Sequence, residues 1–477
     1  MNKNTCLITV IIIFEFFLTV GCHPPAILQE KNGITLPGSF HGSSDTTNIA
    51  QVTRNLFFND PFLNSLIDTA LHNNQELGIV LQDIEITKSN IRLAQAKLTP
   101  IVSAVASLGA EKVGRYTSQG AGDASAEITP GKLVPEILPN QLLGFQASWE
   151  VDIWGKLRTA KKAAFTRYLS SVEAKNWVIT NLIAEIANNY YELLASYQQL
   201  EIIRQAIQLQ QKEWEVVKIQ RQAARVTELA VKQFEAQLLS ARALEFQELQ
   251  QIAVFQNNLS LLSGKFSLLE KPDFNRFMES LPNRLPAGVP AQLLINRPDI
   301  RQAELELQAA KWDVKVARAE FLPTLSIDAR LGYNAFSPKF FLHTPESIFF
   351  SLAGSLVGPF INKNAIKAEF NKASSVQLQT VLNYQKKILN GFLEVTTQLY
   401  AIQNNELSFQ LKKQEVNVLA DAIGIASDLF KSSHANYLEV LTAQRDALEA
   451  RLELVEVKKL QWNALVNLYK SCGGGWR

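Results

Sequence analysis

The chain has 477 residues, of which 47% are hydrophobic and 19% charged, and its formal net charge is +2 at pH 7. This composition allows a large buried core, and so small a charge argues against a nucleic-acid partner. The five histidines are scattered, and the sequence contains no nucleotide-binding or nucleophile motif. We therefore expect neither an enzyme nor a metal site, and no cofactor apart from a covalent lipid.

The first 21 residues have the features of a signal peptide. Lys3 gives a positive start, and the mostly apolar run from Leu7 to Val20 is too short for an ordinary spanning helix. Cys22 follows Gly21 directly after this run, an arrangement that resembles a bacterial lipoprotein processing site. We expect Cys22 to carry the lipid anchor; the alternative is a plain secretory signal. His23, which follows, is compatible with delivery to the outer membrane.

The next segment, residues 22–56, is rich in Pro, Gly, Ser and Asn, which predicts an extended, lipid-anchored tether. A helical pattern then begins at Asp60-Pro61, where proline suits the first turn, and ends at Pro100. Cys6 leaves with the signal peptide, so Cys472 is the one thiol expected in the mature body besides Cys22. No intrachain disulfide is therefore predicted.

The longest helix is predicted from about Lys156 to Ala224, in a stretch that lacks proline and glycine. Apolar residues recur there every seven positions, with a second seam four residues on, which is typical of long helices that pack at a shallow angle. The first seam consists of Val172, Ile179, Ile186, Leu193, Leu200, Ile207 and Trp214, and the second of Ile183, Tyr190 and Tyr197. On this run alone, a long coiled coil or a structural spacer is the better interpretation.

Other segments alternate apolar and polar residues, which predicts strands of about ten residues with one apolar face. The two clearest series are Phe145, Ala147, Trp149, Val151 and Ile153, and Leu325, Ile327, Ala329, Leu331 and Tyr333. Weaker strands are predicted at Ile101–Gly109 and Phe349–Phe360, and long loops at Lys112–Leu142 and Asn334–Ser347. The pattern suits either a transmembrane barrel with a wet lumen or a soluble sandwich. Four strands cannot close a membrane barrel, so the barrel requires an oligomer.

The sequence is duplicated. The stretch Ile91–Pro100 matches Val314–Pro323, and each is a helix that ends in a proline opening a strand. We expect a first structural repeat at residues 57–270, a proline-rich linker at 271–297, a second repeat at 298–470 and a tail at 471–477. Within the long helical runs, breaks are predicted near Ala224–Thr227 and Ser432–Asn436. Asn436 and Glu439 resemble a capping box at the second break.

Five stretches together resemble the TolC-like outer membrane factors of the NodT and OprM type, which are outer-membrane lipoproteins of efflux systems. They are the Cys22 site, Trp149–Arg158, Asn296–Glu304, Tyr437–Arg445 and Leu468–Trp476. The resemblance implies an α+β membrane protein that is mostly helical, with long hairpins forming a helical barrel. Four amphipathic strands from each copy of a homotrimer would form a twelve-stranded transmembrane β-barrel. The implied partners are a periplasmic adaptor (membrane fusion protein) and an inner-membrane pump.

The periplasmic gate departs from the family pattern. Members often carry Asp at two positions of the tip turns that are Ala435 and Ala230 here. Asp421, Asp428 and Arg225 lie within about three turns of the predicted tips, where a threefold ring of charge would set a field in the pore. They are the gate candidates, and the alternative is that all three are ordinary solvated helix charges.

Taken with these patterns, the resemblance implies an exit duct of a tripartite efflux system. It would sit in the bacterial outer membrane, extend into the periplasm and export small molecules passively. Two alternatives stay open. One is the exit duct of a type I protein-secretion system, and the other is a periplasmic coiled-coil scaffold or adaptor. The sequence does not identify the exported substrate, the pump or the adaptor.

Overall fold

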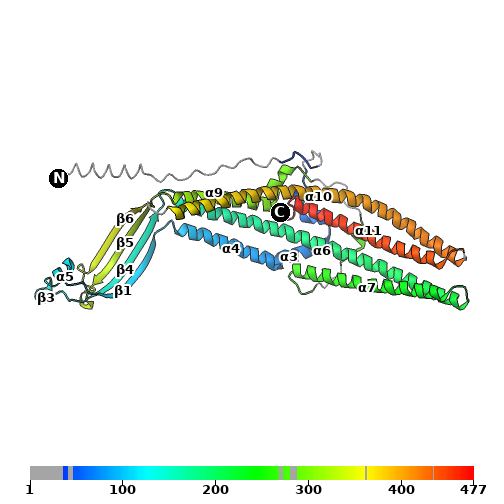
Figure 1. Ribbon diagram of the computed structural model, residues 1–477, viewed down its shortest axis with the longest axis horizontal. Coiled ribbons are helices and arrows are strands. Elements are labelled where there is room, and N and C mark those ends of the chain that lie inside the picture. The colour runs from blue at the N-terminus through cyan, green and yellow to red at the C-terminus, as the bar shows by residue number, and fades with distance from the viewer. Residues whose placement is uncertain (1–35, 41–46, 268–271, 280–286, 360–362, 433) are drawn as a thin grey trace. The chain divides into compact units, whose positions relative to one another are not determined.

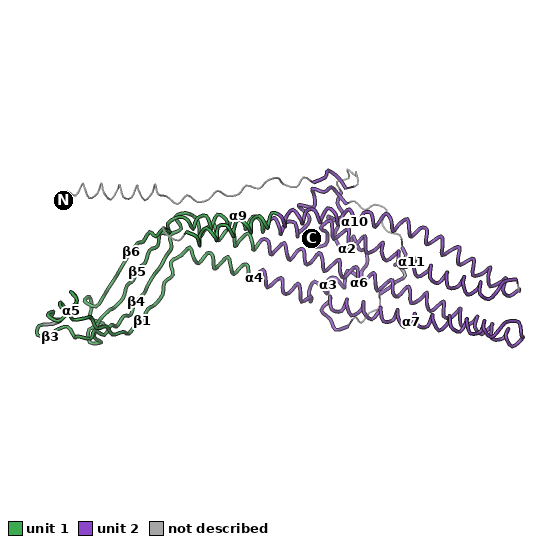
Figure 2. Tube along the Cα trace, in the orientation of Figure 1, with its two compact units in different colours: residues 1–31, 85–168, 305–381 green, residues 32–84, 169–304, 382–477 purple. Residues whose placement is uncertain are grey.

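The computed structural model describes residues 36–40, 47–267, 272–279, 287–359, 363–432 and 434–477. Figure 1 labels its elements, and Figure 2 colours two compact units. Among the described residues, those within 85–168 and 305–381 belong to the first unit, and those within 32–84, 169–304 and 382–477 belong to the second. Cys22 and the whole predicted signal peptide lie outside the described residues, as does the Phe360 end of the predicted fourth strand.

The first unit contains one antiparallel sheet of four strands, as the alternating patterns predict. The strands are β1 (Ile101–Glu111), β4 (Leu138–Val151), β5 (Thr324–Ala335) and β6 (Ile348–Val357), in the order β1-β4-β5-β6. Each half of the sequence thus supplies two strands, and β4 pairs with β5 to join the halves. Figure 1 draws the four strands as arrows that lie side by side.

The strand β4 begins earlier than the sequence predicts, which corrects the expected loop Lys112–Leu142. Leu138 to Leu142 continue the ladder with β1, and Pro139 lies opposite Ala110. Since the pairing of β4 with β5 extends only to Gln141, Pro139 has a strand on one side alone, where a missing N–H is tolerated. The shortened loop holds α5 (Ser118–Asp123), β2 (Glu127–Thr129) and β3 (Lys132–Leu133).

The helices repeat in length between the two halves. Gln75–Ala96 (α4) and Pro298–Ala319 (α9) each have 22 residues. Lys156–Gln222 (α6) has 67 residues and Asn364–Lys431 (α10) has 68. Glu228–Leu262 (α7) and Tyr437–Ser471 (α11) each have 35. Such matched lengths are expected if one unit of structure was duplicated.

The remaining described elements are short. They are η1 (Ile49–Gln51), α2 (Arg54–Phe58), α3 (Pro61–Asn73), η2 (Asn275–Met278), η3 (Pro290–Gln292), α8 (Leu293–Asn296) and η4 (Pro338–Phe340). Among the described residues, none of the helices combines the length and the apolarity needed to cross a membrane.

The core of the second unit lies along the predicted heptad seams of α6. Ile186, Leu193 and Leu200 of the first seam are buried, as are Tyr190 and Tyr197 of the second. They pack against side chains of α3, α7 and α11. The long helix and its packing are therefore as the sequence predicts.

Two expectations for the N-terminal part need correction. The single helix expected from Asp60 to Leu98 is two helices, because Asn74 takes an extended conformation after α3. Its side chain accepts a hydrogen bond from the N–H of Leu77 and donates one to the carbonyl of Leu262. The described part of the expected tether is packed rather than extended: Phe40 and Ile49 are buried.

Candidate functional site

One face of the sheet is apolar across all four strands. The register places Ala104, Phe145, Leu331 and Phe350 in one row. The next row on this face holds Val102, Ala147, Ala329 and Leu352. Phe350 is 81% exposed and Leu352 is 74% exposed. A contiguous exposed apolar surface of this kind marks a face that meets another protein or a membrane.

The opposite face is polar. Ser103, Gln146, Arg330 and Ser351 form one row on this side. Farther along, Glu150 is opposite Ser326, and the hydroxyl oxygens of Ser326 and Ser355 lie 2.7 Å apart. The sheet thus separates an apolar surface from a hydrated one, as the period-two pattern predicts.

Two glycines on the polar face let β4 and β5 approach closely. A Cβ added at Gly144 would lie 2.4 Å from the carbonyl oxygen of Leu331, and one added at Gly332 would lie 2.4 Å from that of Leu143. No other residue fits at this crossing without moving the backbone. Phe349 lies opposite Gly332 on the neighbouring strand, where the missing side chains leave room for its ring.

Both edges of the sheet are open within the described chain. β1 pairs with β4 alone, and β6 pairs with β5 alone. Each edge strand therefore presents a row of unpaired N–H and C=O groups over ten or more residues. Long, apolar edges of this kind are ready to pair with another strand.

The Trp149–Arg158 motif fastens β4 to α6. Asp152 accepts hydrogen bonds from the backbone N–H groups of Leu157 and Arg158, at 2.9 Å each, and so caps the helix start. Gly155 provides the positive φ of the turn. The indole N–H of Trp154 donates to the carbonyl of Pro323, just before β5. The motif thus ties the strand-to-helix joint of one half to the strand start of the other.

The Asn296–Glu304 motif centres on a buried arginine in the second unit. Arg297 is 1% exposed, and its guanidinium bonds both carboxylate oxygens of Asp299, at 3.0 and 2.9 Å. It also reaches Glu394 on α10 at 2.6 Å and the carbonyl of Ser471 at 3.1 Å. A Cβ at Gly391 would lie 3.3 Å from the guanidinium carbon, so glycine makes room for it. Arg297 with these three partners, which we call the buried fork, joins α9, α10 and the end of α11.

The C-terminal motif Leu468–Trp476 packs on the same place. Gly473 has a φ of +88°, and a Cβ there would lie 2.4 Å from the carbonyl oxygen of Asn296. The indole N–H of Trp476 donates to that same oxygen at 3.2 Å. Two stretches that are far apart in the sequence therefore form one structural joint.

The two tip turns close the long helical hairpins, and their places agree with the sequence analysis. The first tip turn (residues 223–227) joins α6 to α7; Ala224 takes a φ of +56°, and Thr227 caps α7. The second tip turn, described at residues 432 and 434–436, lies between α10 and α11, and Asn436 forms the predicted capping box with Glu439. Pairs across each hairpin, Arg204–Glu245 and Lys412–Glu453, fit antiparallel packing.

The three gate candidates are exposed side chains near these turns. Asp428 is 82% exposed and pairs with Lys431 at 3.4 Å. Asp421 and Arg225 also lie on the surface. In the described chain, no hydrogen bond or ion pair joins these three side chains to one another, so a single copy does not bring them together. Whether they form rings depends on further copies.

The structure reveals a partly buried carboxyl near the tips that the sequence analysis did not single out. Glu213 on α6 accepts a hydrogen bond from the side-chain N–H of Gln444 on α11. Burial raises the pKa of the Glu213 carboxyl to about 7, and the ammonium of Lys431 opposes this shift. The sequence offered one signal of a polar site here, the polar residue Gln210 at an inner position of the heptad that includes Trp214. The partner of Glu213, Gln444, could not be found from residue spacing.

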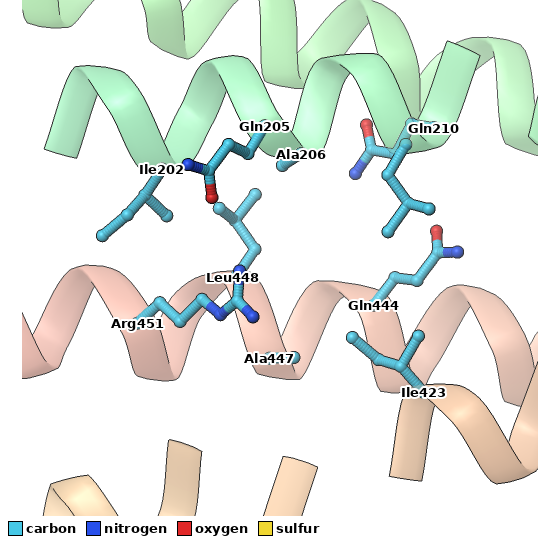
Figure 3. Close-up of a pocket in the computed structure, with 10 residues that line it drawn as sticks. Ile202, Gln205, Ala206, Gln210, Ile423, Gln444, Ala447, Leu448 and Arg451 are labelled. Atoms are coloured by element: carbon cyan, nitrogen blue, oxygen red, sulfur yellow. The ribbon is translucent and has the colours of Figure 1, made fainter. Parts of the chain in front are cut away.

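A small cavity adjoins this group between α6, α10 and α11 (Figure 3). It measures about 210 Å³, and Gln210, Gln444, Leu448 and Arg451 are among the residues that line it. Toward the tips the interior becomes apolar. The tip cluster, as we call it, consists of Val217, Ala230, Val231, Phe234, Val440 and Leu441.

Comparison with known proteins gives consistent matches over most of the chain. The profile of the family described as "Outer membrane efflux protein" matches residues 66–265 and 289–474. The solvent efflux pump outer membrane protein SrpC of Pseudomonas putida is 28% identical over 444 residues, with 92% of this chain and 91% of the relative covered. The probable outer membrane lipoprotein SilC of Salmonella typhimurium is 27% identical over 475 residues, covering 97% and 98%.

A similar fold occurs in a membrane protein from Pseudomonas aeruginosa whose crystal structure is known. The two chains superpose with a TM-score of 0.84 at 23% identity, over 94% of this chain and 99% of the other. At this identity the likeness speaks for the fold alone. It shows that the mostly helical architecture with one small antiparallel sheet is shared with that protein.

Proposed function

This chain belongs to the outer membrane efflux protein family, a family of transport channels, and we propose that three copies of it form a passive exit duct through the outer membrane. The observation that carries the proposal is the four-stranded amphipathic sheet with two open edges. Its apolar face suits lipid and its polar face suits a hydrated lumen. The duct performs no chemistry, and the energy for export comes from a partner in the inner membrane.

The sheet can close only by pairing with other copies. A membrane barrel needs about eight strands or more, and one chain supplies four. Pairing β6 of one copy with β1 of the next uses both edges and repeats around a ring. Three copies give three times four, or twelve, strands. A ring leaves no edge exposed to the hydrocarbon interior, where an unpaired backbone group is costly.

The helices offer a matching surface. Exposed apolar residues follow α10 at intervals of seven and four, which is the pattern of a coiled-coil seam. The seam consists of Leu382, Leu389, Leu393, Tyr400, Leu407, Leu411, Val418, Ile425 and Leu429. Since β6 precedes α10 and α4 precedes β1, ring pairing brings α10 of one copy beside α4 of the next. On α4, Ile79, Ile86 and Leu93 are exposed seven residues apart.

The proposed assembly includes a periplasmic adaptor, an inner-membrane pump and a lipid on Cys22. The relatives named for solvent and pyoverdine export and for cation efflux support a small-molecule cargo. The anchor has support from the relative named as an outer membrane lipoprotein. Replacing Cys22 by Ser should abolish the incorporation of labelled palmitate; continued labelling of that variant would contradict the anchor.

Planar-bilayer recording tests the duct directly. The purified protein, added to a lipid bilayer, should insert and give discrete conductance steps without any added energy source. A protein that never conducts, although it is folded and outer-membrane located in cells, would overturn the duct and favour a scaffold.

A further inference from the structure

We propose that Glu213 and Gln444 form a protonation-dependent latch that holds the α6/α7 hairpin against the α10/α11 hairpin beneath the two tip turns. The inference rests on the proposed duct, and it concerns how the periplasmic end of that duct loosens. It starts from a hydrogen-bonding imbalance at the interface of α6 and α11.

The imbalance involves buried glutamines. Gln210 and Gln444 are each 3% exposed, and the carbonyl oxygen of each side chain finds no hydrogen-bond partner among the described residues. A buried acceptor without a donor is costly. Gln444 already uses its N–H toward Glu213. A protonated Glu213 supplies the missing donor, because its hydroxyl can donate to the Gln444 carbonyl while its other oxygen still accepts the Gln444 N–H.

The surroundings favour that neutral form. Glu213 sits one helical turn from Val217 of the tip cluster and beside Trp214, whose indole N–H is also buried without a partner. An ionised carboxylate at this place loses hydration that the apolar neighbours do not replace. Glu213 is partly buried, so separation of α6 and α11 would hydrate the carboxylate more fully. The adjoining cavity of about 210 Å³ gives water a place to enter (Figure 3).

Nearby charges do not supply a dedicated partner for the carboxylate. Lys431 on α10 is the cation that acts on Glu213, and it is shared with Asp428. On α6, the adjacent Lys212 is exposed, Glu215 accepts a hydrogen bond from Gln211, and Lys218 lies over the ring of Trp214. Other charged groups near this level pair among themselves, as Arg221 does with Glu228, Lys232 with Glu235 and Arg445 with Asp446. Asp421 on α10 is exposed, and Arg451 on α11 lines the cavity.

The direction of the pH effect follows from linkage. The pKa of Glu213 is about 7 when the hairpins are packed, against an ordinary value of 4.5. Below the ordinary value the carboxyl is protonated in both the packed and the separated state, and the latch contributes its full stability. This contribution decreases as pH rises and is lost above about 7. The two hairpins are therefore held together most strongly near the tips in acid, and less strongly at neutral to alkaline pH.

The test uses the intact purified protein with two variants. Glu213→Gln keeps a donor for Gln444 and carries no charge, so it should stay latched at every pH. Glu215→Gln is the matched control, since Glu215 is an exposed neighbour on the same helix. Hydrogen exchange of the tip-turn amides, corrected for intrinsic rates, is measured at about pH 6 and about pH 8 together with bilayer conductance.

We expect protection of the tip amides in the natural protein and in Glu215→Gln to fall at least about tenfold between the two pH values, with conductance rising in parallel. Glu213→Gln should remain protected and poorly conducting at both. If Glu213→Gln keeps the natural pH response, the latch is wrong. Exchange reports the latch even if no form of the protein conducts, in which case the duct fails and the latch is judged on its own.

Discussion

At the scale of single residues, the buried side chain of Arg297 explains the structural role of the Asn296–Glu304 motif. Its guanidinium is buried and bonds the buried Asp299, the half-exposed Glu394 and the main-chain carbonyl of Ser471 at once. Buried charges are stable only when each has its partner. The motif is thus a structural joint between α9, α10 and the end of α11.

Replacing Arg297 by Met should destabilise the protein by about 3–5 kcal/mol, because Asp299 is left buried without its partner. Thermal unfolding of the purified protein measures the loss as a lower midpoint. The double variant with Asp299→Asn should recover part of it. A single variant as stable as the natural protein would contradict the buried fork.

A second residue-scale prediction concerns the first tip turn. Ala224 has a φ of +56°, a conformation that costs a residue with a Cβ roughly 1–2 kcal/mol and glycine almost nothing. Ala224→Gly should therefore stabilise the turn by about 1 kcal/mol, seen as slower hydrogen exchange of its amides. Ala223→Gly, whose φ is not positive, should give no such gain. Equal effects of the two changes would argue against strain at Ala224.

At the scale of elements, the sheet makes the sharpest prediction. Leu352 and Ser351 are neighbours on β6 but point to opposite faces. Leu352→Arg places a charge on the apolar face, which costs about 2–4 kcal/mol at mid-bilayer, whereas Ser351→Arg faces the lumen. Outer-membrane fractions should contain little assembled Leu352→Arg protein and normal amounts of the control. Equal yields would show that this face does not meet lipid.

Some of these elements could be predicted from the sequence and others could not. The limits of α6 and the places of the four strands follow from periodicity, and Asn436 with Glu439 follows from capping chemistry. The break at Asn74 could not be found in this way, because its partner is the carbonyl of Leu262, 188 residues away. The early start of β4 is possible because Pro139 pairs with β1 and has no β5 residue on its other side. The order of the strands in the sheet determines this, and residue periodicity does not show it.

The candidate site was less predictable than the fold. Asp421, Asp428 and Arg225 were chosen for their distance from the tips, and their role stays a prediction because it needs a ring of copies. Glu213 and Gln444 lie 231 residues apart, so their hydrogen bond leaves no local pattern. Such a contact between distant segments can be identified only from the packing of the helices.

At the scale of the whole molecule, duplication accounts for the architecture. Each half contributes two strands and helices of nearly equal length, and the resulting chain has two open sheet edges. The chain belongs to the outer membrane efflux protein family, which confirms the predicted family and location, and its fold is shared with the membrane protein from Pseudomonas aeruginosa. The scaffold alternative offers no reason for an exposed apolar sheet face.

The most direct test of the account is the mass of the particle in mild detergent, measured by light scattering with the detergent contribution removed. The ring predicts three chains, each slightly lighter than the full 53.3 kDa once the signal peptide is lost. Three chains in one stable particle would agree with a closed sheet of twelve strands. A stable, folded monomer would leave both edges of the sheet open and would contradict the duct.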